Sequence, residues 1–230
     1  MITKLLSAAV KFYLRSQVSR VEDLQVKIAG KNSQIIKGYI PQVSLSGKQV
    51  AYRGLHLQEV SIDGTDIAFN LPEVLRKKPL QLLEPIIVDL KVSLAENDLM
   101  ASIDSDLLQS GLSDLWQIIL SAPQTTLTDS QLVDSSIEWN KIAIANKQLN
   151  ISGIYQDNNS QDINLNVSTQ ITSSDGHTLC LFPLKISNGA NIVDELTEKL
   201  EIDLGNDVDI QKLVVESEQI LCLGKITVNN

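Results

Sequence analysis

The sequence has 230 residues and a net charge of −9, and 43% of its residues are hydrophobic although only 4% are aromatic. An acidic chain without a motif of basic and aromatic residues argues against nucleic acid as a partner, and no apolar run approaches the ~20 residues of a membrane span. A core poor in aromatic residues must be built from branched aliphatic side chains, which favour β-strands. We expect a single domain over residues 1–230.

The first predicted element is an amphipathic helix over residues 2–19. Six apolar residues fall on one face at a spacing of about 3.6 residues, and three basic residues gather on the opposite face. Such a helix can fill the concave side of a sheet or lie in a membrane interface. We expect the first, because no other early helix covers the strands that follow. The apolar residues are Ile2, Leu5, Leu6, Ala9, Phe12 and Tyr13, and the basic residues are Lys4, Lys11 and Arg15.

The next segment, residues 23–71, repeats a short pattern with a period of 17 residues. Each copy begins Val-x-aliphatic-x-Gly, and its apolar and polar residues alternate as in a strand with one buried face. Glycine supplies the positive φ of tight hairpin turns, so turns are predicted at Gly47 and Gly64, with a further turn at Gly54. Three short copies are few for a stacked array, which favours an antiparallel meander over a solenoid. The copies open at Val26, Val43 and Val60.

The rest of the chain mixes helices with strands. Ser93 and Glu96 have the spacing of a capping box, which marks the start of a helix, and alternating strands return in the second half of the sequence. The predicted elements are a short helix at 71–79, a strand at 86–94, a long helix at 105–120, a helix around 190–200, and closing strands at 208–215 and 219–228.

The order of these elements predicts the fold class. The strands are consecutive, linked by hairpins and separated from the helices, which indicates α+β with an antiparallel sheet rather than a parallel α/β layer. A sheet with more than about ten strands must coil, split or close. We therefore expect an antiparallel meander sheet that coils, splits or closes, with the long N-terminal amphipathic helix filling its concave side and a second helical segment mid-chain. The strongly curved form of this sheet, wrapped around the helix, is what the family resemblance described below implies.

Residues that could carry chemistry are few. The two histidines, His56 and His177, are expected to face solvent, and the sequence lacks a nucleophile elbow, a phosphate-binding loop, a dinucleotide fingerprint and paired metal-ligand spacing. We therefore expect no enzymatic activity, no cofactor and no metal. Cys180 and Cys222 lie in alternating runs, where they can form a disulfide or stay as buried free thiols, the second being favoured.

Charge is unevenly distributed along the chain. Residues 1–53 carry nine basic and two acidic residues, a balance of +7, whereas residues 190–218 carry nine acidic and two basic residues, a balance of −7. Solvated surface explains many such blocks, and contact of the basic end with an anionic membrane surface is the functional alternative. No secretory signal with a cleavage site opens the sequence, so we expect a cytoplasmic protein, including one at the periphery of a membrane.

Three segments of the sequence carry a recognisable pattern: the amphipathic start followed by "VEDLQVKIAGKNSQIIKGYIPQVSLSGKQVAYRGLHLQEVSIDGTDIAFN", the middle segment "VSLAENDLMASI", and the closing "LVVESEQILCLGKITV". Together they resemble the LmeA-type phospholipid-binding domains of bacteria. The resemblance implies a long helix cradled by a strongly curved sheet, as in tubular lipid-binding domains, with acyl chains between them. It also implies a phospholipid or another long-chain amphiphile as the ligand.

On this resemblance we expect non-enzymatic lipid binding or transfer. The alternative is a structural or interaction module of the cell envelope or membrane periphery with a filled core and no ligand. An aliphatic face that lines a pocket looks the same in sequence as one that fills a core, so the pattern itself separates the two poorly. The expected lipid-binding residues are Leu5, Leu6, Ala9, Tyr13, Val26, Val43, Tyr52, Val60 and Phe69, and the expected membrane-facing residues are Lys4, Lys11 and Arg15.

Overall fold

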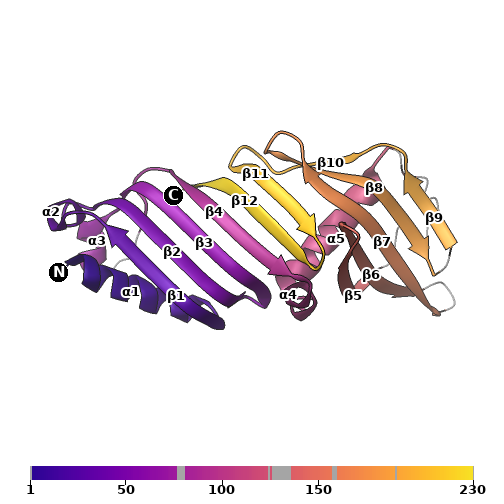
Figure 1. The fold of residues 1–230 in the computed structure, drawn as a ribbon, viewed down its shortest axis with the longest axis horizontal. Coiled ribbons are helices and arrows are strands. Elements are labelled where there is room, and N and C mark those ends of the chain that lie inside the picture. The colour runs from indigo at the N-terminus through magenta and orange to yellow at the C-terminus, as the bar shows by residue number, and fades with distance from the viewer. Residues whose placement is uncertain are drawn as a thin grey trace.

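The computed structural model describes residues 2–76, 81–123, 125, 136–156, 160–189 and 191–229. Within that part the chain forms five helices and twelve strands, and the strands make two antiparallel sheets that follow one another along the molecule (Figure 1). The helices are α1 (Ile2–Gln17), α2 (Asn32–Ile35), α3 (Leu71–Leu75), α4 (Glu96–Ala101) and α5 (Asp106–Ser121). No helix in the described ranges is long and apolar enough to cross a membrane.

The first sheet combines both ends of the chain. Its strand order is β1-β2-β3-β4-β12-β11, so the last two strands extend the sheet beyond β4. These strands are β1 (Arg20–Ala29), β2 (Tyr39–Tyr52), β3 (Leu55–Ala68), β4 (Ile86–Ala95), β11 (Val208–Glu216) and β12 (Gln219–Val228).

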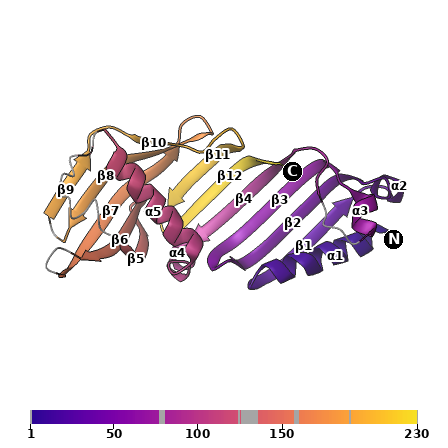
Figure 2. The same cartoon turned by 180° about the vertical axis from the view of Figure 1, so that it is seen from behind.

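The second sheet is formed by the strands between these two ends. Its order is β10-β8-β7-β6-β5, and β9 also pairs with β8. Figure 2 shows α5 lying across this sheet and α1 beside β1 at the far end of the first sheet. The strands are β5 (Glu138–Ala145), β6 (Gln148–Gln156), β7 (Asp162–Ser173), β8 (Thr178–Asn188), β9 (Asn191–Leu196) and β10 (Leu200–Asp203).

The predicted fold class is wrong in its architecture. There are two sheets in place of one, neither is strongly curved, and no sheet wraps around a long N-terminal helix. The 16-residue helix α1 is about 24 Å long at 1.5 Å per residue, enough to cover one end of a six-stranded sheet but not twelve strands. Twelve strands are too many for one open sheet covered by α1, and they are divided between two sheets. The second sheet is covered by its own helix, α5.

Several local predictions need correction as well. The segment predicted as a helix around 190–200 forms strands β9 and β10, which pair with β8. Ser93 lies within β4 and does not cap α4; the Asp98 carboxylate instead accepts a hydrogen bond from the Ala95 N–H at 3.0 Å. In both places long-range strand pairing decides the structure against the local pattern.

The predicted hairpin turns at Gly47 and Gly64 are also wrong. Both glycines lie inside strands, where Gly47 pairs with Val60 and Gly64 with Val43. The turn between β2 and β3 is made by Arg53 and Gly54, at φ of 50° and 80°. Positive φ at both central residues is the geometry of a two-residue hairpin whose twist matches that of its strands.

The main core lies between α5 and the second sheet. The α5 residues Leu112, Trp116 and Ile119 are buried against β5 to β8, and the Trp116 and Trp139 rings meet edge to face with centroids 6.2 Å apart. A second, smaller cluster sits at the opposite end of the molecule under α2. It contains Ile35, Ile40 and Phe69, with Leu6, Ile28, Val43, Ile67 and Leu71 packed against it.

The turn between β7 and β8 joins the two sheets. The Ile210 N–H of β11 donates to the Gly176 carbonyl at 2.7 Å, and the Leu204 N–H donates to the His177 carbonyl at 2.8 Å. The turn itself is held by the Asp175 carboxylate, which accepts from the backbone N–H groups of His177 and Thr178 at 2.9 and 2.8 Å. These hydrogen bonds hold the pKa of the Asp175 carboxyl below its usual value.

The further turn predicted at Gly54 is confirmed, and it implies opposite effects of a Gly→Ala substitution at two positions. Gly54→Ala places a side chain at φ of 80° and a Cβ 2.8 Å from the Ser105 Cβ, so it should lower the free energy of unfolding by about 1 kcal/mol or more. Gly111→Ala, in α5 with no atom within 4 Å of the new Cβ, should raise it by about 0.5–1 kcal/mol. Urea denaturation measures both; equal effects would show that the turn is misplaced.

Candidate functional site

An apolar pocket of about 240 Å³ lies between α1 and the first sheet. Nine of its twelve lining residues are aliphatic, the others being a tyrosine, a serine and a glycine. The helix side is supplied by Leu14 and by Val18, which follows the last turn of α1. The lining residues are Leu14, Val18, Val21, Leu24, Leu45, Ser46, Gly47, Val50, Tyr52, Leu57, Val60 and Ile62.

The face of α1 that packs against the protein is formed by residues spaced four apart. Leu6, Val10 and Leu14 are half-buried, which places one stripe of α1 against the protein. The adjacent Phe12 and Tyr13 are 79% and 61% exposed. The face of α1 that meets the protein is therefore rotated from the one that the apolar spacing of Phe12 and Tyr13 predicts.

Glycine at position 47 leaves room for this pocket. A Cβ built on Gly47 would lie 3.1 Å from methyl carbons of Val21 and Val50, closer than side chains normally pack. Val50 itself faces the pocket because Gln49, at φ of 47°, interrupts the regular alternation of β2. Gly47 of the repeat therefore allows close packing of side chains on a strand, and it does not form a turn.

We call the face of the first sheet that carries Leu45, Val60 and Ile62 the inner face. Residues that pair directly across antiparallel strands project from the same face, so the register of the sheet extends this face beyond the pocket. Two rows of paired residues cross β2, β3, β4, β12 and β11 in that order. They are Leu45, Ile62, Leu90, Gly224 and Ile210, and Gly47, Val60, Val92, Cys222 and Leu213.

These two rows belong to neither core cluster. Apart from Gly47, which is buried, their residues are half-buried. Five strands at a spacing of about 4.8 Å give each row a length of about 19 Å. This exceeds half of the ~30 Å hydrocarbon core of a bilayer, which is the depth that one acyl chain fills. The inner face therefore offers a continuous apolar strip of acyl-chain length.

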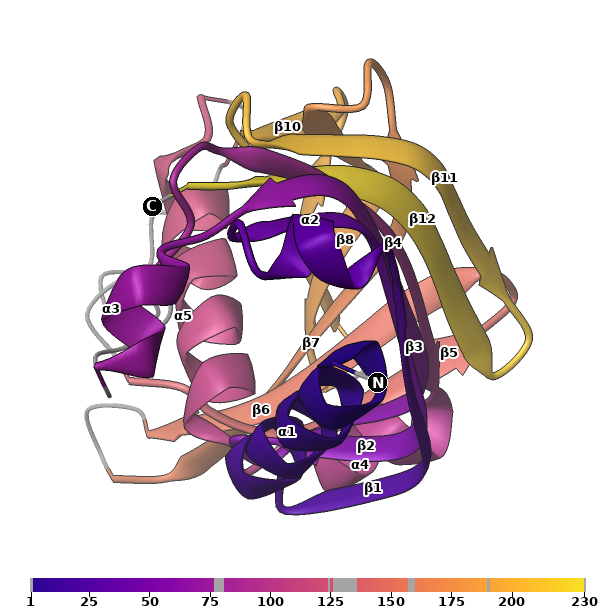
Figure 3. The ribbon, with the colours of Figure 1, turned by 90° about the vertical axis from the view of Figure 1, so that its left-hand side faces the viewer.

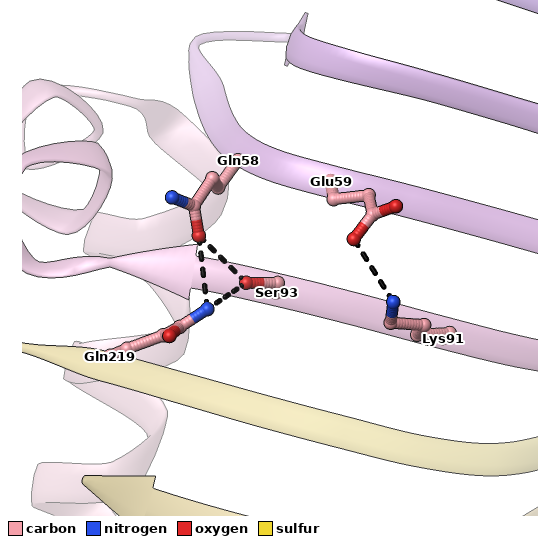
Figure 4. Close-up of polar contacts among 5 residues, drawn as sticks. All are labelled: Gln58, Glu59, Lys91, Ser93 and Gln219. Atoms are coloured by element: carbon pink, nitrogen blue, oxygen red, sulfur yellow. Dashed lines mark hydrogen bonds and ion pairs between the residues drawn. The ribbon is translucent and has the colours of Figure 1, made fainter.

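The opposite, outer face of the same strands is polar (Figure 4). Lys91 of β4 pairs with Glu59 of β3 at 3.0 Å. The Gln219 side-chain amide donates to the Ser93 hydroxyl at 2.5 Å and to the Gln58 carbonyl at 3.0 Å, while the Ser93 hydroxyl donates to the same carbonyl at 2.9 Å. These contacts tie β3, β4 and β12 together on a polar face, where the Lys91–Glu59 pair is partly exposed and Ser93 is buried.

The structure brings some of the residues expected from the sequence to this site. Tyr52 and Val60 line the pocket, and Val26 pairs with Leu45, which places it on the inner face. The Arg53 guanidinium lies over the ring of Tyr52, 5.5 Å from its centroid, and Tyr52 is itself partly exposed.

Other expected residues lie elsewhere. Phe69 belongs to the smaller core cluster, and Leu6 and Val43 pack against it, Val43 from the end of the inner face beyond Leu45. Tyr13 is exposed, and among the basic residues Lys11 is half-buried and Arg15 exposed. The side chains of Lys4, Leu5 and Ala9 lie outside the described part of the structure.

Sequence reasoning missed most of the pocket. Leu45 and Ile62 share the alternation of Val43 and Val60, so the strand pattern contained that signal. Val50 and Leu57 depend on the irregularity at Gln49, which the pattern does not reveal. Leu14 and Val18 depend on the rotation of α1.

Groups that could catalyse a reaction are not gathered at the pocket. Within the described ranges no three His, Cys, Asp or Glu side chains are grouped as metal ligands would be. His177 contacts the Val208 carbonyl at the junction of the sheets, away from the pocket. Cys180 and Cys222 are free thiols on different sheets. Cys222 lies on the inner face, and burial there raises the pKa of its thiol.

The Cys222 thiol provides a test of the inner face. Since only the thiolate is nucleophilic and its pKa lies above the usual 9.0, iodoacetamide should alkylate Cys222 of the folded Cys180→Ala variant more slowly than a free thiol at pH 8. The rate should keep rising with pH above 9. Cys180, which is 6% exposed, should react more slowly still in Cys222→Ala. Alkylation of Cys222 at the rate of a free thiol would contradict its burial in the apolar strip.

Comparison with known protein families assigns the chain to one of them. A family model described as LmeA-like phospholipid-binding matches residues 1–225. No curated protein and no solved structure matches the chain. Because the family match covers nearly the whole sequence, the protein belongs to the LmeA-like phospholipid-binding family.

Proposed function

We propose that this protein binds a phospholipid or a similar long-chain amphiphile without catalysing a reaction, and that an acyl chain lies along the inner face of the first sheet. The family supports lipid binding in general. The observation that supports this location is the apolar pocket under α1 together with the two rows of half-buried aliphatic residues that continue it. Neither core cluster includes these rows.

The size of the pocket limits what it encloses. Its volume of about 240 Å³ is below the ~300–1,000 Å³ typical of sites that bury a whole small ligand. One segment of an acyl chain therefore enters under α1, and the remainder lies along the rows. Burial contributes about 0.8 kcal/mol per methylene, so ten methylenes give roughly 8 kcal/mol before the costs of association are subtracted.

The proposed setting is the surface of an anionic membrane, with the protein peripheral to it on the cytoplasmic side and lipid transfer as the outcome. Lys4, Lys11 and Arg15 are the proposed membrane-facing residues, each contributing up to about 1 kcal/mol near an anionic surface. Arg53, which lies over the Tyr52 ring beside the pocket, is a further cation within reach of a head group. An exchange of lipid with the bilayer requires the pocket to open towards it.

Two neighbouring substitutions test the location of the lipid. Ile62 lines the pocket, whereas Ser61 projects from the outer face with its partner Lys91. Ile62→Trp should reduce bound lipid by at least about tenfold, since an indole takes the volume that the chain needs. Ser61→Trp should leave bound lipid unchanged. Native mass spectrometry of protein purified without detergent and then incubated with liposomes measures both.

The same measurement separates lipid binding from the alternative, a structural module with a filled core. Wild-type protein that remains a bare chain before and after liposome incubation would favour the structural module. Equal loss of lipid in both tryptophan variants, with circular dichroism showing both to be folded, would place the lipid elsewhere.

A further inference from the structure

The outward side of α1 carries the most exposed large hydrophobic side chain of the described residues. Phe12 is 79% exposed, and the adjacent Tyr13 is 61% exposed. Phe12 lies on the side of α1 opposite the stripe of Leu6, Val10 and Leu14, and Tyr13 lies at the edge of that stripe. Two exposed aromatic rings on one turn of a helix retain apolar surface that a partner can cover.

The charge around this pair is positive. Lys11 precedes Phe12, Arg15 lies one turn after it, and α1 contains no acidic residue, although the whole chain has a net charge of −9. Neither Lys11 nor Arg15 has a carboxylate partner among the described residues. Arg15 is exposed like Phe12, whereas Lys11 is half-buried at the edge of the face that meets the protein. The outward side of α1 is therefore aromatic with basic residues on it and at its edge, which complements an anionic interface.

We propose that α1 docks the protein on an anionic bilayer, with Phe12 and Tyr13 inserted at the level of the head groups and with Lys11 and Arg15 in contact with their phosphates. An aromatic ring with a hydroxyl suits this boundary, since its apolar body enters the lipid and its polar end stays in water. Basic residues beside the rings add attraction to anionic lipids, the usual pattern of helices that lie in an interface.

This inference rests on the proposed function, because the same helix forms one wall of the pocket. Leu14 directly follows Tyr13 and lines the pocket from the other side of α1. Figure 3 shows α1 lying beside the first sheet at the end of the molecule that faces the viewer. Docking through Phe12 and Tyr13 therefore brings the helix that walls the pocket against the bilayer. This position shortens the path of an acyl chain from the bilayer to the pocket.

A bilayer fits this surface better than a protein partner. Two aromatic side chains bury at most about 500 Å², well below the ~1,200–2,000 Å² of a stable protein interface. Binding to a membrane does not need a minimum contact area of this kind, because each inserted ring adds to the electrostatic attraction between basic residues and anionic lipids. A second copy of the chain on the same surface is the competing occupant that the experiment must separate.

The first arm of the experiment measures binding to vesicles. Phe12→Ser/Tyr13→Ser should bind vesicles of phosphatidylglycerol and phosphatidylcholine at least about tenfold more weakly than the wild type in co-sedimentation, because both rings leave the interface. Ile192→Ser is the matched control, since Ile192 is also 61% exposed but lies on β9 of the second sheet. It should bind vesicles as the wild type does.

The second arm detects insertion directly. Trp116 and Trp139 are both 3% exposed, so their emission should stay constant, and Phe12→Trp adds one indole at the proposed contact. Its emission should shift to the blue on addition of the anionic vesicles and be quenched by brominated acyl chains. An unshifted Phe12→Trp signal, or wild-type vesicle affinity in the double serine variant, would overturn the proposal.

Two further outcomes would also overturn it. One is an equal loss of vesicle binding in Ile192→Ser, which would mean that exposed apolar residues act without regard to position. The other is a change of oligomeric state in the double serine variant by light scattering, which would assign the rings to a second copy. The double serine variant should still bind lipid that is supplied in detergent micelles. If neither this variant nor the wild type binds such lipid, the result counts against the proposed function rather than against docking.

Discussion

The pairing of β12 with β4 is the contact on which the first sheet depends. Ten consecutive register pairs, from Gln219 with Ala95 to Val228 with Ile86, join the last strand of the chain to one that precedes it by more than a hundred residues. Without this ladder the sheet would end at β4, and the inner rows would lose Cys222, Gly224 and everything beyond them. The length of the apolar strip therefore follows from a long-range pairing.

The two sheets differ in how much of their apolar face is covered by a helix. In the second sheet α5 covers the apolar face, and residues such as Leu165, Leu184 and Ile186 are completely buried. In the first sheet α1 covers only the end beside β1, and the rows across the middle strands stay half-buried. A ligand that covers these rows would stabilise the complex by about 25 cal/mol per Å² of apolar surface removed from water. Residues of a filled core are already buried and offer no such gain.

The sequence predicted individual strands better than their assembly. The alternation in residues 43–47 and 60–64 and the closing strands near 208–215 and 219–228 correspond to observed strands, since alternation reports the burial of one face. It does not report which strand lies beside which. The return of β11 and β12 to β4, and the split into two sheets, are decided by contacts between residues far apart in the chain.

The candidate site was predictable only where it depends on alternation. Val60 could be found from the strand pattern, but the orientation of α1 could not, because apolar residues occur around more than one side of that helix. Leu14 faces the pocket while Phe12 and Tyr13 face outward. Packing against β1, rather than the spacing of apolar residues, determines which side is buried.

We propose that an acyl chain lies on the inner face of the first sheet, and photocrosslinking tests this proposal directly. A phospholipid with a photoactivatable group in its acyl chain, bound to the protein and irradiated, should modify residues of the two inner rows, such as Ile62, Val92 and Cys222, when the products are mapped by mass spectrometry. Modification confined to the outer face, or to the second sheet around α5, would contradict the claim.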